Sequence, residues 1–155
     1  MQVASSPIIN NIARPFTCSA WVRIDGWYDN LWASFFNKSG PTQAVDSVQL
    51  HFQIRKTGTP YSFAPWICSF LSGGVVPTTS NWFHFTVVQD VTDIRLYING
   101  ELKNTFACSA PVVKNNHPLL LGSDPPGAQE YLIGAMDEFR MYNRALTAEE
   151  VLLLQ

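Results

Sequence analysis

Apolar and polar residues alternate along most of this chain, which is the pattern of strands with one buried and one solvated face. Clusters of Gly, Pro, Asn, Asp and Ser separate the alternating runs. Many short strands at near-regular spacing predict an all-β sandwich of two antiparallel sheets. The clearest runs lie at residues 16–24, 48–55, 82–88 and 94–98, and weaker ones near 31–37, 64–72 and 118–122.

Two local signals predict how particular elements begin and end. Asn99-Gly100 favours positive φ at both positions, so residues 101–107 should return as the second strand of a hairpin. Near the C-terminal end, Thr147 and Glu150 have the spacing of a capping box. Leu146 and Val151 fit a hydrophobic staple around it, which predicts a short helix after Thr147.

Composition limits the class of protein more than it identifies a function. The 155 residues suit a single domain, 1–155, and 46% of them are hydrophobic. A net charge of −2 predicts no attraction to nucleic acid or to an anionic membrane. No apolar stretch is long enough for a membrane span, and Met1-Gln2-Val3 does not open a signal peptide.

The chain has three cysteines, Cys18, Cys68 and Cys108, so at most one disulfide can form within it. Each cysteine shares its strand parity with large apolar residues. Buried thiols that act as small hydrophobic side chains are therefore the favoured interpretation. No Cys/His cluster indicates zinc or redox chemistry.

Four segments together resemble the laminin-G-like jelly roll of the concanavalin-A-like lectin/glucanase superfamily. They are residues 16–22 (Phe-Thr-Cys-Ser-Ala-Trp-Val), 82–88, the Leu-Tyr-Ile-Asn-Gly hairpin within 94–102, and the closing segment 137–151. The resemblance implies a jelly roll with a short C-terminal helix. The family usually has another strand before Gln2-Val3; that strand is missing here, supplied by another chain, or rebuilt from residues 2–9.

No catalytic residue is predicted. Asp137 and Glu138 are neighbours in a strand, so their side chains should point to opposite faces and cannot flank one glycosidic bond. The glucanases of the family carry Glu-x-Asp-x-Glu on one strand face, and this chain has no such pattern. Asp137 shares its parity with apolar residues, which predicts a partly buried carboxylate with Arg144 as its partner.

The loop around residues 25–32 is the first candidate ligand site. Aromatic rings stack on sugars, and planar polar groups take their hydroxyls. The alternative is that Trp27 and Tyr28, expected to be exposed, simply cover one end of the sandwich. The predicted contacts from loops are Trp27, Tyr28, Asp29, Asn30 and Tyr61.

The wet face of the strand at 48–55 is a second candidate platform, although every antiparallel sheet with one solvated face has this pattern. Its polar side chains are Gln49, His51, Gln53 and Arg55, joined by Arg95 and Tyr97 if the two strands lie near each other. The three histidines lack metal-ligand spacing, so no metal ligand is predicted.

Calcium is implied only by the family resemblance. Asp29-Asn30 and residues 124–130 are the loop sources of the oxygen ligands that calcium requires.

The predicted function is a non-catalytic carbohydrate-binding module of a larger extracellular or cell-surface protein. The alternative is a structural or adhesion module that contacts protein or a second copy of itself in a surface or particle assembly. A glycoside hydrolase or lyase is a third possibility, which the missing carboxylate arrangement disfavours. The sequence does not identify the ligand, the parent protein or the oligomeric state.

Overall fold

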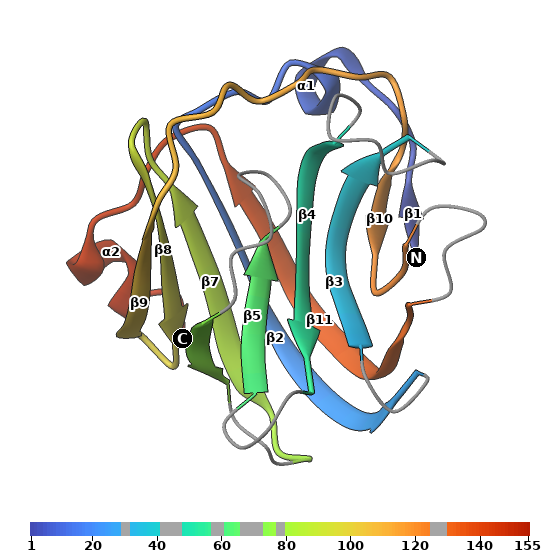
Figure 1. The fold of residues 1–155 in the computed structure, drawn as a ribbon, viewed down its shortest axis with the longest axis vertical. Coiled ribbons are helices and arrows are strands. Elements are labelled where there is room, and N and C mark those ends of the chain that lie inside the picture. The colour runs from blue at the N-terminus through green and yellow to red at the C-terminus, as the bar shows by residue number, and fades with distance from the viewer. Residues whose placement is uncertain (29–31, 41–47, 57–60, 66–72, 77–79, 125–129) are drawn as a thin grey trace.

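The computed structural model describes residues 1–28, 32–40, 48–56, 61–65, 73–76, 80–124 and 130–155. Two antiparallel sheets face each other, as the alternation predicts, and enclose the core (Figure 1). The order of strands is β1-β10-β3-β4-β5-β6 in one sheet and β11-β2-β7-β8-β9 in the other. The prediction of an all-β jelly-roll sandwich with a short C-terminal helix is confirmed.

Most of the strand bounds agree with the alternating runs. Of the weaker run expected near 64–72, only residues 64 and 65 belong to a strand, and residues 66–72 lie outside the described residues. The six-stranded sheet contains β1 (Gln2–Val3), β10 (Leu119–Leu121), β3 (Trp32–Ser39), β4 (Val48–Arg55), β5 (Tyr61–Pro65) and β6 (Gly73–Val76). The five-stranded sheet contains β11 (Leu132–Tyr142), β2 (Phe16–Trp27), β7 (Phe83–Gln89), β8 (Asp93–Ile98) and β9 (Glu101–Ala107). Two helices, α1 (Pro7–Asn10) and α2 (Ala148–Leu152), complete the described elements.

The hairpin predicted around Asn99-Gly100 joins β8 to β9. Asn99 has φ of 49° and Gly100 has φ of 71°, as a turn that requires two positive φ values demands. The strands pair directly at the turn, with Ile98 opposite Glu101.

Phenylalanine fills the centre of the sandwich. Phe35 meets Phe85 edge to face with ring centroids 4.9 Å apart, and Phe36 lies 5.9 Å from the same ring. Strict alternation would send one of these two neighbours out of the core. A register shift between Ser34 and Phe36 in the β3–β4 pairing removes that conflict, and both rings are fully buried.

The C-terminal corner is capped as predicted. The Thr147 side chain accepts from the Glu150 backbone N–H, and the Glu150 carboxylate accepts from the Thr147 backbone N–H. The hydroxyl of Thr17 in β2 donates to the Arg144 carbonyl at 2.9 Å and accepts from the Leu146 N–H at 3.1 Å. These bonds fasten the corner to the sheet.

Thr147→Ala should lower the free energy of unfolding by about 1 kcal/mol, because the cap satisfies a backbone donor that otherwise has no partner within the helix. Urea denaturation measures the change. Thr147→Ser keeps the hydroxyl and should retain most of the stability. Equal losses in both variants would show that the capping bond is not responsible.

A short helix that the sequence did not predict, α1, lies over one end of the sandwich. Ser6 caps it and Pro7 occupies its first turn. Beneath it the ammonium of Lys38 donates to Asn10 Oδ1 at 3.0 Å and to the backbone carbonyls of Asn115 and His117. Burial lowers the pKa of Lys38 to about 8.

The cysteine prediction is correct for Cys18 and wrong for Cys108. Cys18 is a buried free thiol whose pKa is raised by burial. Cys108, at the end of the hairpin, is part of a disulfide. Cys68 lies outside the described residues. Parity with apolar neighbours indicates burial in both cases, but it does not separate a thiol from a disulfide.

Candidate functional site

A cluster of polar side chains lies on the face of the six-stranded sheet that points away from the core. Its centre is Asp124, which follows β10 and is 3% exposed. Asp124 Oδ1 accepts hydrogen bonds from Ser34 Oγ at 2.6 Å and from Asn37 Nδ2 at 3.1 Å, both in β3. His51 Nε2 in β4 lies 3.0 Å from the same oxygen. Three groups from two strands therefore converge on one carboxylate oxygen.

These contacts determine the charge of Asp124. Burial opposes ionisation, but the hydrogen bonds from His51 and Ser34 favour the carboxylate and outweigh it, so the pKa of Asp124 lies below its ordinary value. The side chain of Glu130 is also in hydrogen-bond contact with Asp124. Two ionised carboxylates cannot share a hydrogen bond, so this contact requires a proton on one of them; a metal ion bound between them would take the place of that proton.

The cluster offers ligands for a metal ion. One ligand atom from each of His51, Asp124 and Glu130 lies within 4.8 Å of the other two. Calcium prefers six to eight oxygen ligands and fits this set poorly, because one donor is an imidazole nitrogen. Asn37 does not correct the deficit: its Oδ1 accepts from Ser39 and its Nδ2 points at Asp124.

Ser34, His51 and Asp124 do not form a nucleophilic triad. In a triad the imidazole lies between the hydroxyl and the carboxylate. Here the hydroxyl and the imidazole both contact Asp124 Oδ1, so the histidine is not placed to take the proton of Ser34.

A second group of side chains forms an aromatic rim at one end of the sandwich. Trp27 ends β2 opposite Leu132 of β11, and Tyr28 bridges to Trp32 at the start of β3. The rings of Tyr28 and Tyr131 meet edge to face, with centroids 5.5 Å apart. We call Trp27, Tyr28, Trp32, Tyr131 and Arg55 the aromatic rim.

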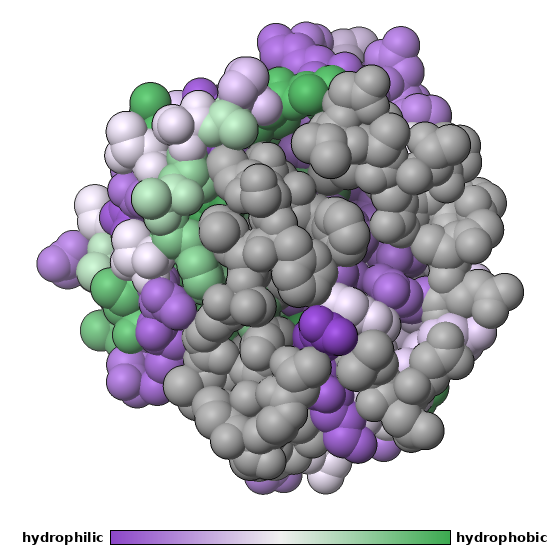
Figure 2. Space-filling model, in the orientation of Figure 1, coloured by the Kyte–Doolittle hydropathy of each residue, from purple (hydrophilic) through white to green (hydrophobic). Residues whose placement is uncertain are grey.

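Arg55 adds a cation to the rim. It ends β4, pairs with Trp32, and holds its guanidinium carbon 5.0 Å from the centroid of the Trp32 ring. Figure 1 shows β2 ending, β3 beginning and β11 beginning at the lower right of the molecule. In the same view, strongly hydrophilic side chains lie at the lower end of β4 (Figure 2). The rim thus combines aromatic rings with polar groups at one edge.

The structure brings together only part of the predicted ligand site. Trp27, Tyr28 and Arg55 all lie at the rim, but Trp27 and Tyr28 are half-buried rather than exposed, and Trp27 packs against the core. Asp29 and Asn30 lie outside the described residues. Tyr61 is in β5, and its side chain is not described.

The prediction that the polar face of β4 is exposed to solvent is wrong. His51 and Gln53, like Gln49, are fully buried although they face away from the core. Arg95 and Tyr97 belong to β8 in the other sheet, so they cannot extend this platform. Alternation correctly separates the two faces of the strand, but it does not report whether the polar face is covered.

Asp137 differs from its prediction. Its side chain is exposed and accepts from the Glu138 N–H at 2.8 Å, whereas Arg144 pairs with Glu150 at 2.7 Å. The reason is a register irregularity between Asp137 and Arg140, where Glu138 has φ of 48°. The parity argument fails at such a bulge.

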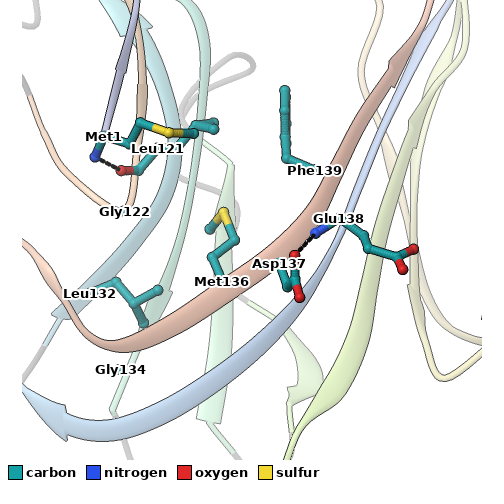
Figure 3. Close-up of a pocket in the computed structure, with 9 residues that line it drawn as sticks. All are labelled: Met1, Leu121, Gly122, Leu132, Gly134, Met136, Asp137, Glu138 and Phe139. Carbon is teal, nitrogen blue, oxygen red and sulfur yellow. Dashed lines mark hydrogen bonds between the residues drawn. The ribbon is translucent and has the colours of Figure 1, made fainter.

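The bulge borders a cavity of about 510 Å³ between β10 and β11. Figure 3 shows Met136 and Phe139 on the side of β11 that faces β10, whereas Glu138 points away. The lining combines apolar side chains, among them Met1, Leu121 and Leu132, with polar surface. It presents no pair of carboxylates to a common point.

Several residues of the candidate sites have no role that the sequence predicts. Tyr131 gives no signal on its own in the sequence. Asp124 and Glu130 were noted only as sources of oxygen, because nothing local indicates that they meet His51. A partner of Asp124 lies as far as 90 positions away in the chain, at Ser34.

The fold is shared with several solved structures. Domain 4 of AbnA, a GH43 extracellular arabinanase from Geobacillus stearothermophilus in complex with arabinotriose, is 20% identical, with a TM-score of 0.70 over 99% of this chain and 70% of that one. A heptameric SAP-like pentraxin from Limulus polyphemus is 14% identical, with a TM-score of 0.69 over 98% and 71%. The binding domain of Botulinum neurotoxin DC, in complex with rat synaptotagmin II, is 17% identical, with a TM-score of 0.61 over 95% and 37%.

At these identities the likeness concerns the fold alone. No curated protein sequence matches the chain. A sequence model for one family does match, and it spans residues 2–152. The resemblance seen in the four segments is therefore confirmed, and the chain belongs to the concanavalin A-like lectin/glucanase superfamily.

Proposed function

We propose that this chain is a non-catalytic binding module for carbohydrate and that the aromatic rim is its contact surface. The observation that carries the proposal is a continuous series of contacts at the rim: the ring of Tyr28 meets that of Tyr131, Tyr28 pairs with Trp32, and Arg55 lies over the ring of Trp32. Aromatic faces pack against the C–H faces of sugars, and a guanidinium donates to hydroxyl or carboxylate oxygens. The arabinotriose complex of a structure with this fold supports the ligand class.

The carboxylates of the described residues favour binding over hydrolysis. Glycosidases place two carboxyl groups about 5–9.5 Å apart on either side of the scissile bond. One carboxylate oxygen of Asp124 lies within 4.8 Å of one of Glu130, closer than this spacing. Asp137 and Glu138 are exposed neighbours on a bulge.

The disulfide of Cys108 supports a place outside the reducing cytoplasm. Solved structures of this fold include an extracellular arabinanase, which agrees with an extracellular or cell-surface location. No helix among the described residues has the length and apolar character needed to cross a membrane.

Tyr131→Ala should weaken carbohydrate binding about tenfold or more, because it removes one stacking face from the rim. The experiment first screens a glycan array and arabinotriose with the unmodified chain, and then measures the affinity for the best ligand by isothermal titration calorimetry. Tyr28→Ala should have a similar effect, because its ring contacts that of Tyr131.

Trp82→Ala is the matched control. Trp82 is 42% exposed, as Tyr131 is, but it lies against Arg23 rather than at the rim. If Trp82→Ala lost affinity while Tyr131→Ala and Tyr28→Ala kept it, the carbohydrate site would not be the aromatic rim. An array and titrations that find no carbohydrate ligand would contradict the function itself, and turnover of a polysaccharide would contradict its non-catalytic character.

Protein contact through the edge of β11 is the second candidate function. Among the described strands β11 pairs on one side only, with β2, and edge strands invite pairing with another chain. It also borders a further cavity of about 800 Å³, lined by apolar residues such as Ile9, Leu119 and Met141. Light scattering over a range of concentrations tests self-association, and a mass that stays monomeric throughout argues against it.

A further inference from the structure

We propose that His51, Asp124 and Glu130 form a binding site for a divalent transition metal ion of the Zn²⁺ class. The site is separate from the aromatic rim, and the inference does not depend on carbohydrate binding. It also differs from the calcium that the family resemblance implies. The proposal rests on the donor types, their separation, their burial and the charge that they bring together.

The donor types select the metal. One imidazole nitrogen and two carboxylates are a ligand set of zinc and related ions, which bind nitrogen and oxygen at about 2.0–2.2 Å. Calcium and magnesium prefer oxygen alone. The two oxygen-bearing neighbours, Ser34 and Asn37, direct a hydroxyl and an amide N–H at Asp124, so they act as donors to the carboxylate.

The distances fit an ion after small adjustments. Atoms bound to one tetrahedral zinc ion at such bond lengths lie about 3.3–3.6 Å from one another. His51 Nε2 and Asp124 Oδ1 are 3.0 Å apart, and all three ligand atoms lie within 4.8 Å of one another. Shifts of about 1 Å therefore bring all three onto a common ion. A fourth position remains for a water molecule or another oxygen donor.

The electrostatics of the cluster call for a positive charge. The His51 side chain is fully buried, and Asp124 is nearly so. Two carboxyl groups in contact at such a place are stabilised by a cation, and a divalent ion balances both of them while the imidazole remains neutral. The bonds from Ser34 and Asn37 hold Asp124 in place, as partners of metal ligands commonly do.

The test uses the full chain after chelator treatment and dialysis. Zn²⁺, Ca²⁺ and Mg²⁺ are added separately and followed by isothermal titration calorimetry and thermal denaturation. At a free Zn²⁺ concentration of about 100 times Kd, we expect the Tm to rise by about 5–10 °C. Ca²⁺ and Mg²⁺ at the same concentration should produce no comparable rise. No zinc binding, or calcium binding of equal strength, overturns the proposal.

Variants locate the site. Glu130→Gln is the first choice because Glu130 is only half-buried and the change keeps its shape. It should weaken zinc binding at least tenfold, and His51→Gln should do the same wherever that variant remains folded. His117→Gln is the control, because His117 forms its hydrogen bonds to Lys38 and Asn115 through backbone atoms only. Zinc affinity that survives in Glu130→Gln, or that is lost in His117→Gln, overturns the assignment.

Discussion

Replacing Asp124 with alanine is expected to lower the free energy of unfolding by about 3–5 kcal/mol, because each buried hydrogen-bonding group left without its partner costs about 1–3 kcal/mol. The change leaves Ser34, Asn37 and His51 without the oxygen that they share. Urea denaturation of the chelator-treated protein measures the loss. Asp25→Ala is the control, because it removes an aspartate whose ion pair with Arg23 is exposed.

The effect of Asp124 should depend on pH in a defined direction. Its pKa is lower in the folded chain than in the unfolded one, so its contribution is complete above the ordinary carboxyl pKa of about 3.9. The contribution is lost as the pH falls through the lower value of the folded state. The difference in stability between the unmodified chain and Asp124→Ala should therefore shrink below about pH 4. A difference that stays constant down to pH 2 would contradict a charged Asp124.

Phe85→Ala is expected to cost about 3–5 kcal/mol through the cavity that it leaves in the core. The Phe85 ring projects from β7 of the five-stranded sheet and is fully buried. It meets two rings of the opposite, six-stranded sheet, with centroids 4.9 Å from Phe35 and 5.6 Å from Phe63. Removing it takes away two of the ring contacts that join the two sheets.

Phe85→Leu provides the comparison for the core. It keeps most of the apolar volume, so it should lose clearly less stability than alanine. Denaturant midpoints and slopes from both variants separate a loss of stability from a change in the unfolded state. Equal costs for alanine and leucine would show that volume is not what this position supplies.

Much of the fold could be predicted because its signals are local. Alternation located β2, β4, β7 and β8, and Asn99-Gly100 and Thr147 marked a turn and a helix start. Exceptions occur where the backbone leaves its regular repeat. The bulges at Ser34/Phe36 and Asp137/Arg140 change which face of the sheet a side chain occupies. The alternation of apolar and polar residues does not indicate where such bulges occur.

The candidate sites were predicted less completely, because they are assembled by pairing between distant segments. Trp27 and Tyr28 are adjacent in the sequence, but Tyr131 meets Tyr28 only because β11 pairs with β2. The sequence predicts an exposed His51, whereas its side chain is fully buried. Periodicity indicates to which face of the sheet a side chain points, but not whether other parts of the chain cover that face. The closeness of His51 to Asp124 follows from the position of β10 beside β3, which no local pattern encodes.

The bond between Thr17 and Arg144 has a consequence for the timing of folding. The two residues are 127 positions apart, and the pairing of β2 with β11 spans a similar interval. At ordinary rates of translation, about 5–20 residues per second, β2 leaves the ribosome on the order of 10 s before its neighbour does. During that interval the edge of β2 that pairs with β11 in the folded chain has no partner strand. We therefore expect slow folding governed by long-range contacts, with the five-stranded sheet completed only after synthesis has passed Tyr142.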